Sequence, residues 1–180
     1  MFSFRIDDHL ELRLHEEHHA EALYEVIEQN REHIGQWLPF VDWTDGPDDT
    51  LEFIRGARKR WAEGRAVPTS IWLDGQLVGT IGFVNMNREQ KRAEIGYWLA
   101  AEHQGKGIVT RATRALVDYG FAELGLYRIE VRCEPSNERS FGVPERLGFT
   151  FEGVARGYAT FRDRQIDHRV YSILRDEWDG

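Results

Sequence analysis

The stretch that decides the fold runs from Arg92 to Thr110 and reads RAEIGYWLAAEHQGKGIVT. Its first part, Arg92 to Ala100, is rich in apolar residues and predicts a strand. The glycine-containing loop His103 to Gly107 follows, and a helix is expected to begin at about Ile108. A strand that runs through such a loop into a helix presents unpaired backbone N–H groups, which favour an anion. The stretch therefore predicts an α/β fold with an anion-binding turn, although an ordinary strand-to-helix turn would have the same pattern.

The side chains of this turn suit a phosphate or pyrophosphate. Lys106 adds a cation and Thr110 a hydroxyl group. The turn is not a P-loop, because the Gly-x-x-x-x-Gly-Lys-Ser/Thr spacing is absent, and it is not the dinucleotide-binding pattern Gly-x-Gly-x-x-Gly. These residues thus indicate the class of ligand, and other parts of the chain must indicate which ligand it is.

Hydrophobic periodicity and turn residues predict the elements on either side of this stretch. Upstream, we expect a strand at Leu10–Leu14, helices at His18–Asn30 and from Asp49 or Thr50 to about Glu63, and a hairpin of Ser70–Leu73 and Gln76–Val84 around Asp74-Gly75. Downstream, we expect a helix at Ile108–Leu124, a strand at Arg128–Glu134, a short helix to Leu147, and strands at Phe149–Thr160 and Asp167–Leu174. This order lacks the strict βαβα alternation of a doubly wound sheet and predicts a mixed sheet.

Length and composition limit the classes of protein to which the chain can belong. The 180 residues predict a single domain, 1–180, and a net charge of −8 disfavours nucleic acid as a partner. One cysteine excludes a disulfide framework and a cysteine-based zinc cluster. The apolar runs are too short to span a membrane, and the N-terminus lacks the pattern of a signal peptide. We therefore expect a reduced, cytoplasmic protein with no membrane partner.

Histidines and aromatic residues near the N-terminus offer two further hypotheses. His15, His18 and His19 lie close together, but they lack the spacing of metal ligands, so no metal is expected. Most of the aromatic residues between 37 and 61 are expected in the core, although some could form the wall of an acceptor pocket: these are Trp37, Phe40, Trp43 and Trp61. The carboxylates nearby could attract a cationic acceptor or could simply be solvated: these are Asp42, Asp45, Asp48 and Asp49.

Several motifs together resemble a known family. Gln104-Gly105-Lys106-Gly107-Ile108-Val109 is similar to the Gln/Arg-x-x-Gly-x-Gly/Ala acyl-CoA motif of the GCN5-related N-acetyltransferases (GNAT). AEIGYW, Asn137-x-x-Ser140, LGF, Glu152-Gly153 and YSILRDEW resemble the RimJ/RimL branch of that family, which acetylates the N-termini of ribosomal proteins. One departure is Val109, at a position where a small residue is usual.

This resemblance implies a fold and a donor site. The fold would be a mostly antiparallel sheet of about seven strands with one splayed parallel pair and about four helices. Acetyl-CoA would enter between the splayed strands as a co-substrate, with no metal. The residues implied for its binding are Ile95, Tyr97, Trp98, Leu99, Gln104, Gly105, Lys106, Gly107, Ile108, Val109, Thr110 and Asn137.

The resemblance also implies catalytic residues, each with a structural alternative. Ser140 would be the general acid, although a serine early in a helix often bonds to the backbone. Asn137 would hold the pantetheine arm and could also cap the helix. Glu94 is our first choice of general base, and its alternative role is a surface ion pair. The position at which some RimL-type enzymes carry a base is Ala159 here, so the local alternatives are Tyr158, Asp163, Asp167 and His168.

Cys133 would be needed for a mechanism through an acetyl-cysteine. It shares a strand face with Ile129 and Val131, so we expect a buried, inert thiol and direct attack by the amine in a ternary complex. The implied acceptor is a primary amine, most simply the N-terminal α-amine of a ribosomal protein. The alternatives are a small amine such as a polyamine, an antibiotic or an aminoacyl nucleotide, or a non-catalytic acyl-CoA-binding module. A homodimer is plausible by analogy with the branch.

Overall fold

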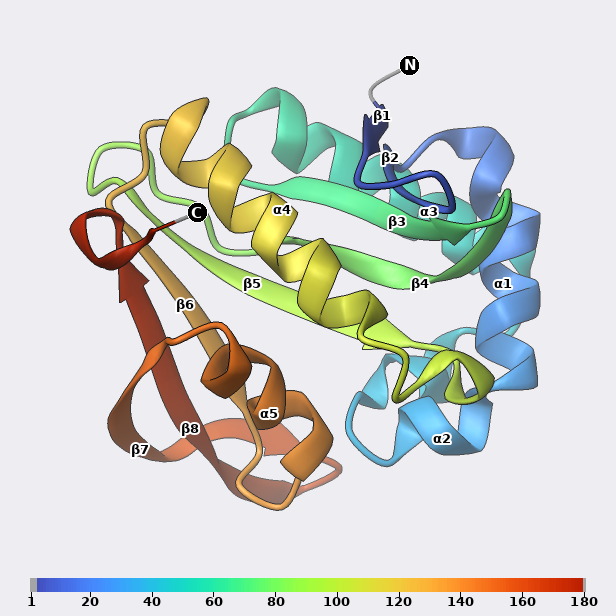
Figure 1. Ribbon diagram of the computed structural model, residues 1–180. Helices are drawn as coiled ribbons and strands as arrows, with labels where there is room; N and C mark the ends of the chain where they lie inside the picture. Colours follow the sequence, from blue (N-terminus) through green and yellow to red (C-terminus); the bar gives the residue numbers. More distant parts are fainter. Residues whose placement is uncertain (1–2, 180) are drawn as a thin grey trace.

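The computed structural model describes residues 3–179 of the chain, and one mixed sheet runs through it (Figure 1). Within these residues the sheet has eight strands in the order β1-β2-β3-β4-β5-β6-β8-β7. The strands are β1 Ser3–Arg5, β2 Leu10–Leu14, β3 Val67–Leu73, β4 Gln76–Phe83, β5 Arg92–Leu99, β6 Arg128–Cys133, β7 Thr150–Phe161 and β8 Arg164–Leu174. The α-helices are α1 Ala20–Gln29, α2 Arg31–Gly35, α3 Pro47–Ala62, α4 Ile108–Ala122 and α5 Glu138–Arg146, and the 3₁₀ helices are η1 Glu17–His19, η2 Pro39–Trp43, η3 Ala101–His103 and η4 Arg175–Glu177.

One strand pair of this sheet is parallel. Strands β5 and β6 run side by side from Arg92 opposite Arg128 to Ile95 opposite Val131, and their pairing ends there. Figure 1 shows the two strands diverging beyond that point. The other neighbouring strands pair in antiparallel fashion. The sheet therefore opens at the centre of the molecule, where the sequence leads from β5 into α4.

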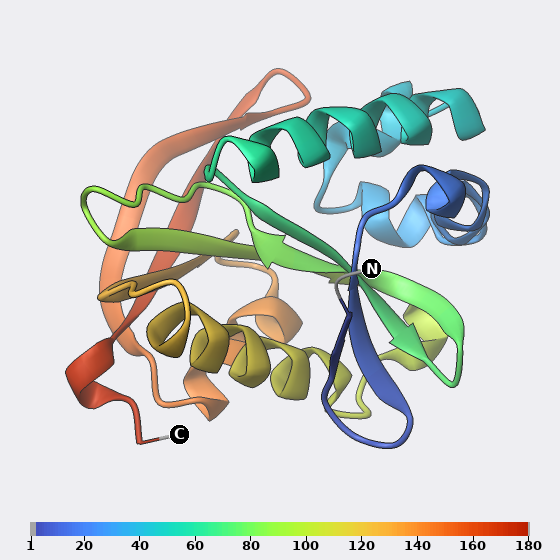
Figure 2. The same ribbon diagram turned by 90° about the horizontal axis from the view of Figure 1, so that it is seen from above.

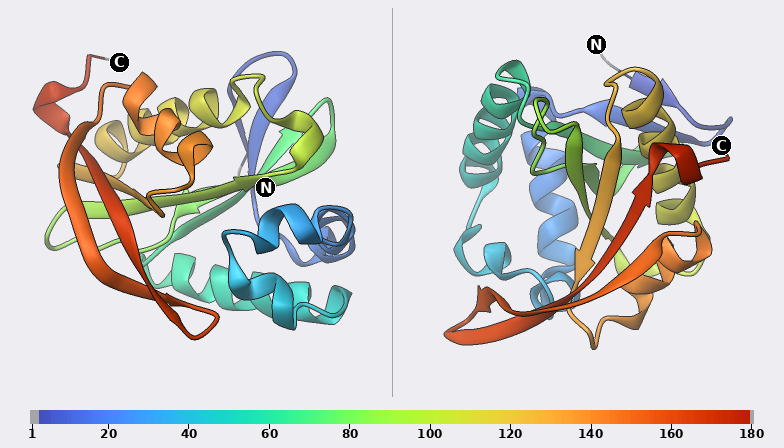
Figure 3. Two further views of the ribbon diagram at one scale, coloured as in Figure 1. Left: turned by 90° about the horizontal axis from the view of Figure 1, so that it is seen from below. Right: turned by 90° about the vertical axis from the view of Figure 1, so that its left-hand side faces the viewer.

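Helices cover both faces of the sheet, as the views in Figures 2 and 3 show. α4 and α5 lie on one face, where Leu116 and Val117 of α4 join the core formed by the inward side chains of the strands. α1, α2 and α3 lie on the other face, where Leu23 and Ile54 pack with Trp72 in a second core. The opening between β5 and β6 is thus accessible from two differently built layers.

The expected mixed sheet with a splayed parallel pair is confirmed, and two elements are additional. β1 has three residues and α2 has five, lengths at which hydrophobic periodicity gives no signal. β3 begins at Val67 rather than Ser70, since Pro68 disfavours a strand by sequence rules but is tolerated here. Within residues 3–179, no helix combines the length and the apolar character needed to cross a bilayer.

Candidate active site

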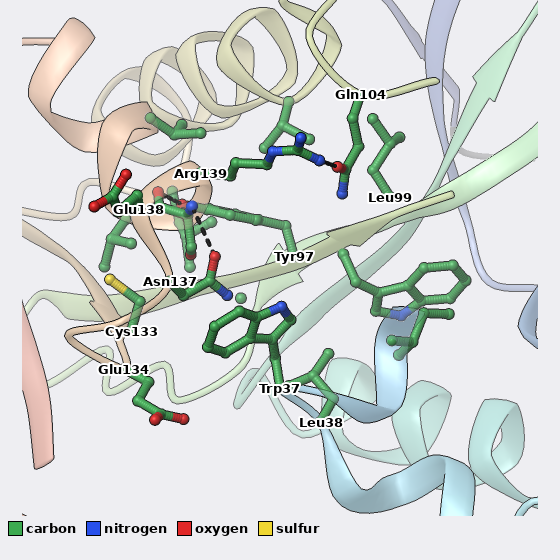
Figure 4. A pocket seen from close by; sticks show the side chains of 18 of the residues that line it. Trp37, Leu38, Tyr97, Leu99, Gln104, Cys133, Glu134, Asn137, Glu138 and Arg139 are labelled. Atoms are coloured by element: carbon green, nitrogen blue, oxygen red, sulfur yellow. Dashed lines mark hydrogen bonds between the residues drawn. The ribbon is translucent and has the colours of Figure 1, made fainter. Parts of the chain in front are cut away.

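A cavity of about 1240 Å³ occupies the opening between β5 and β6. Its lining comes from both strands, from the loop that leads into α4, from α5 and from the segment after α2. Figure 4 shows side chains from these elements converging on it, with Tyr97 and Leu99 from β5, Cys133 from β6 and Trp37 from the opposite layer. The end of the β5–β6 ladder is therefore the start of a cleft that crosses the sheet.

The backbone of β5 determines which groups face this cleft. Val84 N–H donates to the carbonyl of Glu94, and Ala100 N–H donates to that of Val78, so the even-numbered residues of β5 bond to β4. Because backbone direction alternates along a strand, the N–H and C=O groups of Tyr97 and Leu99 face the side that β6 has left. The backbone of Trp98 bonds to β4 instead, although Trp98 also lines the cavity.

The turn before α4 has the geometry that suits an anion. Gly105 and Gly107 have φ angles of 74° and 69°, a region in which a side chain is strained. The N–H of Arg111 is bonded to the carbonyl of Gly107, so the N–H groups of Ile108–Thr110 precede the first bonded turn of the helix. Lys106 is exposed in the same loop. Donor groups and positive partial charge therefore gather where the sequence predicts an anion.

Four of the residues predicted to bind the donor have side chains in the core. Ile95, Leu99 and Ile108 are buried, and Val109 packs partly against the same cluster. The backbone of these residues borders the cleft, and the side chain of Leu99 also lines it (Figure 4). Val109, at a position where the family motif usually has a small residue, is partly buried against this core and also lines the cavity.

Arginines of α5 add positive charge that sequence reasoning missed. Arg139 donates to Oε1 of Gln104, and Arg146 donates to Oγ1 of Thr110 over 3.2 Å. Nε2 of Gln104 lies 2.7 Å from Nε2 of His33, so the glutamine links α5 to α2 across the cleft. The two arginines are seven residues apart and share one helix face, a signal that the sequence does contain.

The first turn of α5 positions Asn137 and Ser140. Oδ1 of Asn137 accepts a hydrogen bond from the Ser140 N–H at 3.1 Å, so Asn137 caps the helix, and its amide nitrogen turns toward Trp37 in Figure 4. The Ser140 hydroxyl lies 3.5 Å from that of Tyr97, and the Tyr97 hydroxyl donates to the Ser140 carbonyl over 2.7 Å. Burial raises the pKa of Tyr97, so this phenol keeps its proton.

Cys133 is the buried thiol that its strand pattern predicts, and it also lines the cavity. Its exposed fraction is 6%, and burial raises its pKa to about 11 although the Ser140 side chain bonds to it. A thiol in this environment is almost entirely protonated at neutral pH. It is therefore a poor nucleophile.

Glu94 lies on the cleft with two neighbours. Its Oε2 accepts a hydrogen bond from Nδ2 of Asn85 at 3.1 Å and lies 3.9 Å from Nε of Arg132. Burial raises the pKa of this carboxyl group, while the contacts with Asn85 and Arg132 oppose the rise. A partly desolvated carboxylate at a cleft can take up a proton more readily than an exposed one.

The four alternative bases occupy different places on the β7–β8 hairpin. His168 lines the cavity, and its Nδ1 is buried without a hydrogen-bond partner among the described residues. Burial lowers its pKa, and Tyr158 stacks on it with 5.0 Å between ring centroids. Asp167 accepts a hydrogen bond from the N–H of Gly157, while Asp163 lies in the turn between the two strands. Of these four residues, His168 is the one that lines the cavity.

Comparison with known proteins identifies the family. The model of the Acetyltransferase (GNAT) domain matches residues 9–150. This chain belongs to the GNAT family. It is an acetyltransferase that uses acetyl-CoA as its donor, as the motifs around Gln104 and Ser140 indicate.

Several relatives of this acetyltransferase carry names that describe an acceptor. It is 39% identical over 181 residues to the putative ribosomal N-acetyltransferase YdaF of Bacillus subtilis, covering 100% of this chain and 99% of that protein. It is 31% identical to the ribosomal-protein-serine acetyltransferase of Escherichia coli, covering 97% of each. Among solved structures it is similar to RimL, a ribosomal L7/L12 alpha-N-protein acetyltransferase in complex with coenzyme A, with a TM-score of 0.92, 26% identity, and coverage of 98% and 99%.

The aromatic residues before and within α3 divide between two cavities of the acetyltransferase. Trp37 lines the main cavity, whereas Phe40 and Trp43 line a second cavity of about 410 Å³ between η2, α1 and α3. The expectation that this cluster is mainly core is wrong for Trp43 and Trp61, which are 63% and 40% exposed. Trp43 lines the second cavity, whereas Trp61 lines neither of the two cavities.

An ion pair joins η2 to the turn between β7 and β8. Nε and Nη2 of Arg162, in the β7–β8 turn, donate to the carboxylate of Asp42 in η2 over 2.7 and 2.8 Å. Gly35 permits the approach, since a Cβ atom there would come within 3.3 Å of the Arg162 guanidinium group. Among residues 3–179, no cluster of three or more histidine, cysteine or acidic side chains is arranged to hold a metal ion.

Proposed function

We propose that this acetyltransferase transfers the acetyl group of acetyl-CoA to the N-terminal α-amine of a ribosomal protein, by direct attack in a ternary complex. The observation that carries the proposal is the early end of the β5–β6 ladder at Ile95, because it opens a cleft to both layers. A donor and an acceptor can then meet from opposite sides. The printed activities of the RimL-type relatives support a ribosomal acceptor.

On the donor side, the pyrophosphate would lie on the N–H groups of Gly105–Thr110, since that of Gln104 already donates to the Ala101 carbonyl, with Lys106, Arg139 and Arg146 supplying charge. The pantetheine amides would bond to the backbone of Tyr97 and Leu99, which takes the place of the missing part of the ladder. The amide nitrogen of Asn137 would donate a hydrogen bond to the same arm from the other wall.

Acetyl transfer requires a group that stabilises the oxyanion, an acid that protonates the departing thiolate and a base that takes the proton from the amine. The neutral amine attacks the thioester carbonyl, a C–N bond forms, and the carbonyl becomes an oxyanion that the N–H of Tyr97 or Leu99 can stabilise. Collapse of the tetrahedral intermediate breaks the C–S bond and releases the thiolate of CoA. The Ser140 hydroxyl, at the first turn of α5, gives this thiolate a proton and is reprotonated from water.

The proton that leaves the amine goes to Glu94, directly or through water. Its partial burial and raised pKa make Glu94 a better proton acceptor than an exposed carboxylate. The buried, protonated thiol of Cys133 argues against an acetyl-cysteine intermediate. Direct attack therefore requires both substrates to be bound together.

The test uses acetyl-CoA calorimetry followed by a free-thiol release assay on three acceptors: peptides with a free N-terminus, the same peptides with a blocked N-terminus, and polyamines. We expect turnover of the free peptides and intersecting initial-rate plots, with the acetyl group on the α-amine by mass spectrometry. Turnover of polyamines alone, or binding of acetyl-CoA without turnover of any acceptor, would contradict the proposal. Glu94→Gln should reduce the rate most above the pKa of this carboxyl group, where the wild-type side chain is ionised and can accept a proton, and the difference should shrink as the pH falls. Glu89→Gln is an exposed control.

A further inference from the structure

The second cavity adjoins the cleft at one side chain. Trp98 lines both cavities, and its ring packs near Phe40 with 6.4 Å between centroids. Thr80, directly opposite Trp98 on β4, forms part of the floor. The two cavities therefore lie side by side at β5, with the Trp98 side chain between them. They are separated by about the width of one indole ring.

The lining of this cavity offers apolar contacts. Leu23 and Ile27 of α1 form one wall, and Phe53 of α3 forms part of another. Three of the polar side chains that line it already have partners: the Thr50 hydroxyl lies within hydrogen-bond distance of the carbonyls of Ala20 and Pro47, that of Thr44 donates to the Phe40 carbonyl, and the Asp49 carboxylate accepts two backbone N–H groups. A ligand that enters would meet mainly hydrocarbon and aromatic rings.

Two large aromatic side chains at the rim remain exposed to solvent. Trp43 is 63% exposed and Phe53 is 49% exposed, and both line the cavity. Exposed aromatics beside a preformed apolar cavity are typical of a binding site rather than of a core. The carboxylates of Asp49 and Glu52 stand among the lining residues, so the charge around the rim complements the positive N-terminal segment of a polypeptide.

We propose that this second cavity is an acceptor subsite that binds an apolar side chain at the second or third residue of the polypeptide to be acetylated. This rests on the proposed function, which places the reacting α-amine near Tyr97–Leu99. An extended chain advances about 3.3–3.6 Å per residue, so the second or third residue reaches past one indole ring from that point. The subsite makes the enzyme selective by side-chain size and apolarity, beyond recognition of the amine.

The experiment measures kcat/KM for peptides that differ at residues two and three, with Ala, Leu, Phe or Asp at each. The wild-type enzyme should prefer Leu or Phe over Ala by about 10-fold or more, the range for filling an apolar pocket. Trp43→Ala and Phe53→Ala together should reduce this preference to less than about threefold. Phe53→Leu should retain most of it, because it keeps an apolar wall.

Trp61→Ala is the matched control, since Trp61 is 40% exposed on the helix that carries Phe53 and lines neither cavity. It should leave the preference unchanged, and acetyl-CoA calorimetry on every variant verifies the fold. Equal turnover of all peptides by the wild type would overturn the subsite and leave the proposed function standing. Equal loss of preference in Trp61→Ala would overturn the assignment to this cavity. Turnover of no peptide would overturn the proposed function itself.

Discussion

The two halves of the cleft are built in different ways. Most of the donor half comes from one continuous stretch, Arg92 to Thr110, which presents backbone N–H and C=O groups, and the α5 region adds the side chains of Asn137, Arg139 and Arg146. The acceptor half is assembled from η2, α3 and the β7–β8 hairpin, which lie far apart in sequence, and it presents side chains. A constant ligand such as CoA can be bound by backbone geometry, whereas a variable acceptor needs side chains that differ between relatives.

This contrast predicts that the donor half is sensitive to a single charge. Gly105→Glu places a carboxylate where the pyrophosphate is expected, and it should weaken acetyl-CoA binding by at least about 100-fold in calorimetry. Gly75→Glu is the matched control, because Gly75 has a similar φ of 79° and lies in the β3–β4 turn, with no atom within 4 Å of a Cβ there. Equal affinity in both variants would mean that the anion binds elsewhere.

Where the two halves meet, a substitution should change the catalytic rate rather than the affinity for acetyl-CoA. Ser140→Ala should reduce kcat by roughly 10- to 100-fold and leave the acetyl-CoA dissociation constant unchanged, since its hydroxyl acts on the departing thiolate. Ser136→Ala provides the comparison, because that hydroxyl bonds to Glu134 at the same cavity. Wild-type turnover by Ser140→Ala would remove this serine from the mechanism.

In the acceptor layer, stability should depend on pH through His15. Its ring bonds to the Ser70 hydroxyl over 2.8 Å and lies against Phe53, and burial lowers its pKa to about 4. The unfolded chain, with a pKa near 6.5, takes up the proton first, so stability falls as the pH drops from about 6.5 to 4, by up to about 1.4 kcal/mol per pH unit.

His15→Asn should flatten this slope in urea unfolding at pH 7, 6 and 5, because the amide cannot be protonated. His18→Asn, at an exposed neighbour, should keep the slope. An unchanged slope in His15→Asn would assign the pH dependence to other groups.

The smallest expected effect concerns the ion pair between Asp42 and Arg162. Asp42→Asn should raise KM for a peptide by about two- to fivefold without changing acetyl-CoA affinity, since an exposed pair contributes little. The wild-type KM should approach that of the variant in 0.5–1 M salt, roughly, because salt screens this pair. Asp45→Asn is the control on the same loop, and an effect of equal size there would indicate general electrostatics.

The same contrast explains what the sequence could reveal. The turn at Gly105 and Gly107 and the cap at Asn137 follow from local patterns, and they were predictable. The pairing of β5 with β6 joins distant segments, and it was expected only from the family resemblance. The positions of Trp43 and Arg162 were not predictable, because they depend on contacts between distant segments. Arg162 and Asp42, for example, are 120 residues apart in the sequence. Arg139 and Arg146 are intermediate, since their helical spacing was visible but their target was not.

The short β5–β6 ladder has a mechanical consequence. Four residue pairs join the five-stranded lobe of β1–β5 to the three-stranded lobe of β6, β8 and β7 within the described part of the chain. Acetyl-CoA bound between the two lobes would hold them together. The rigidity of the enzyme should therefore increase with the concentration of its donor substrate. The acetyl-CoA-bound enzyme should therefore resist proteolysis better than the free enzyme.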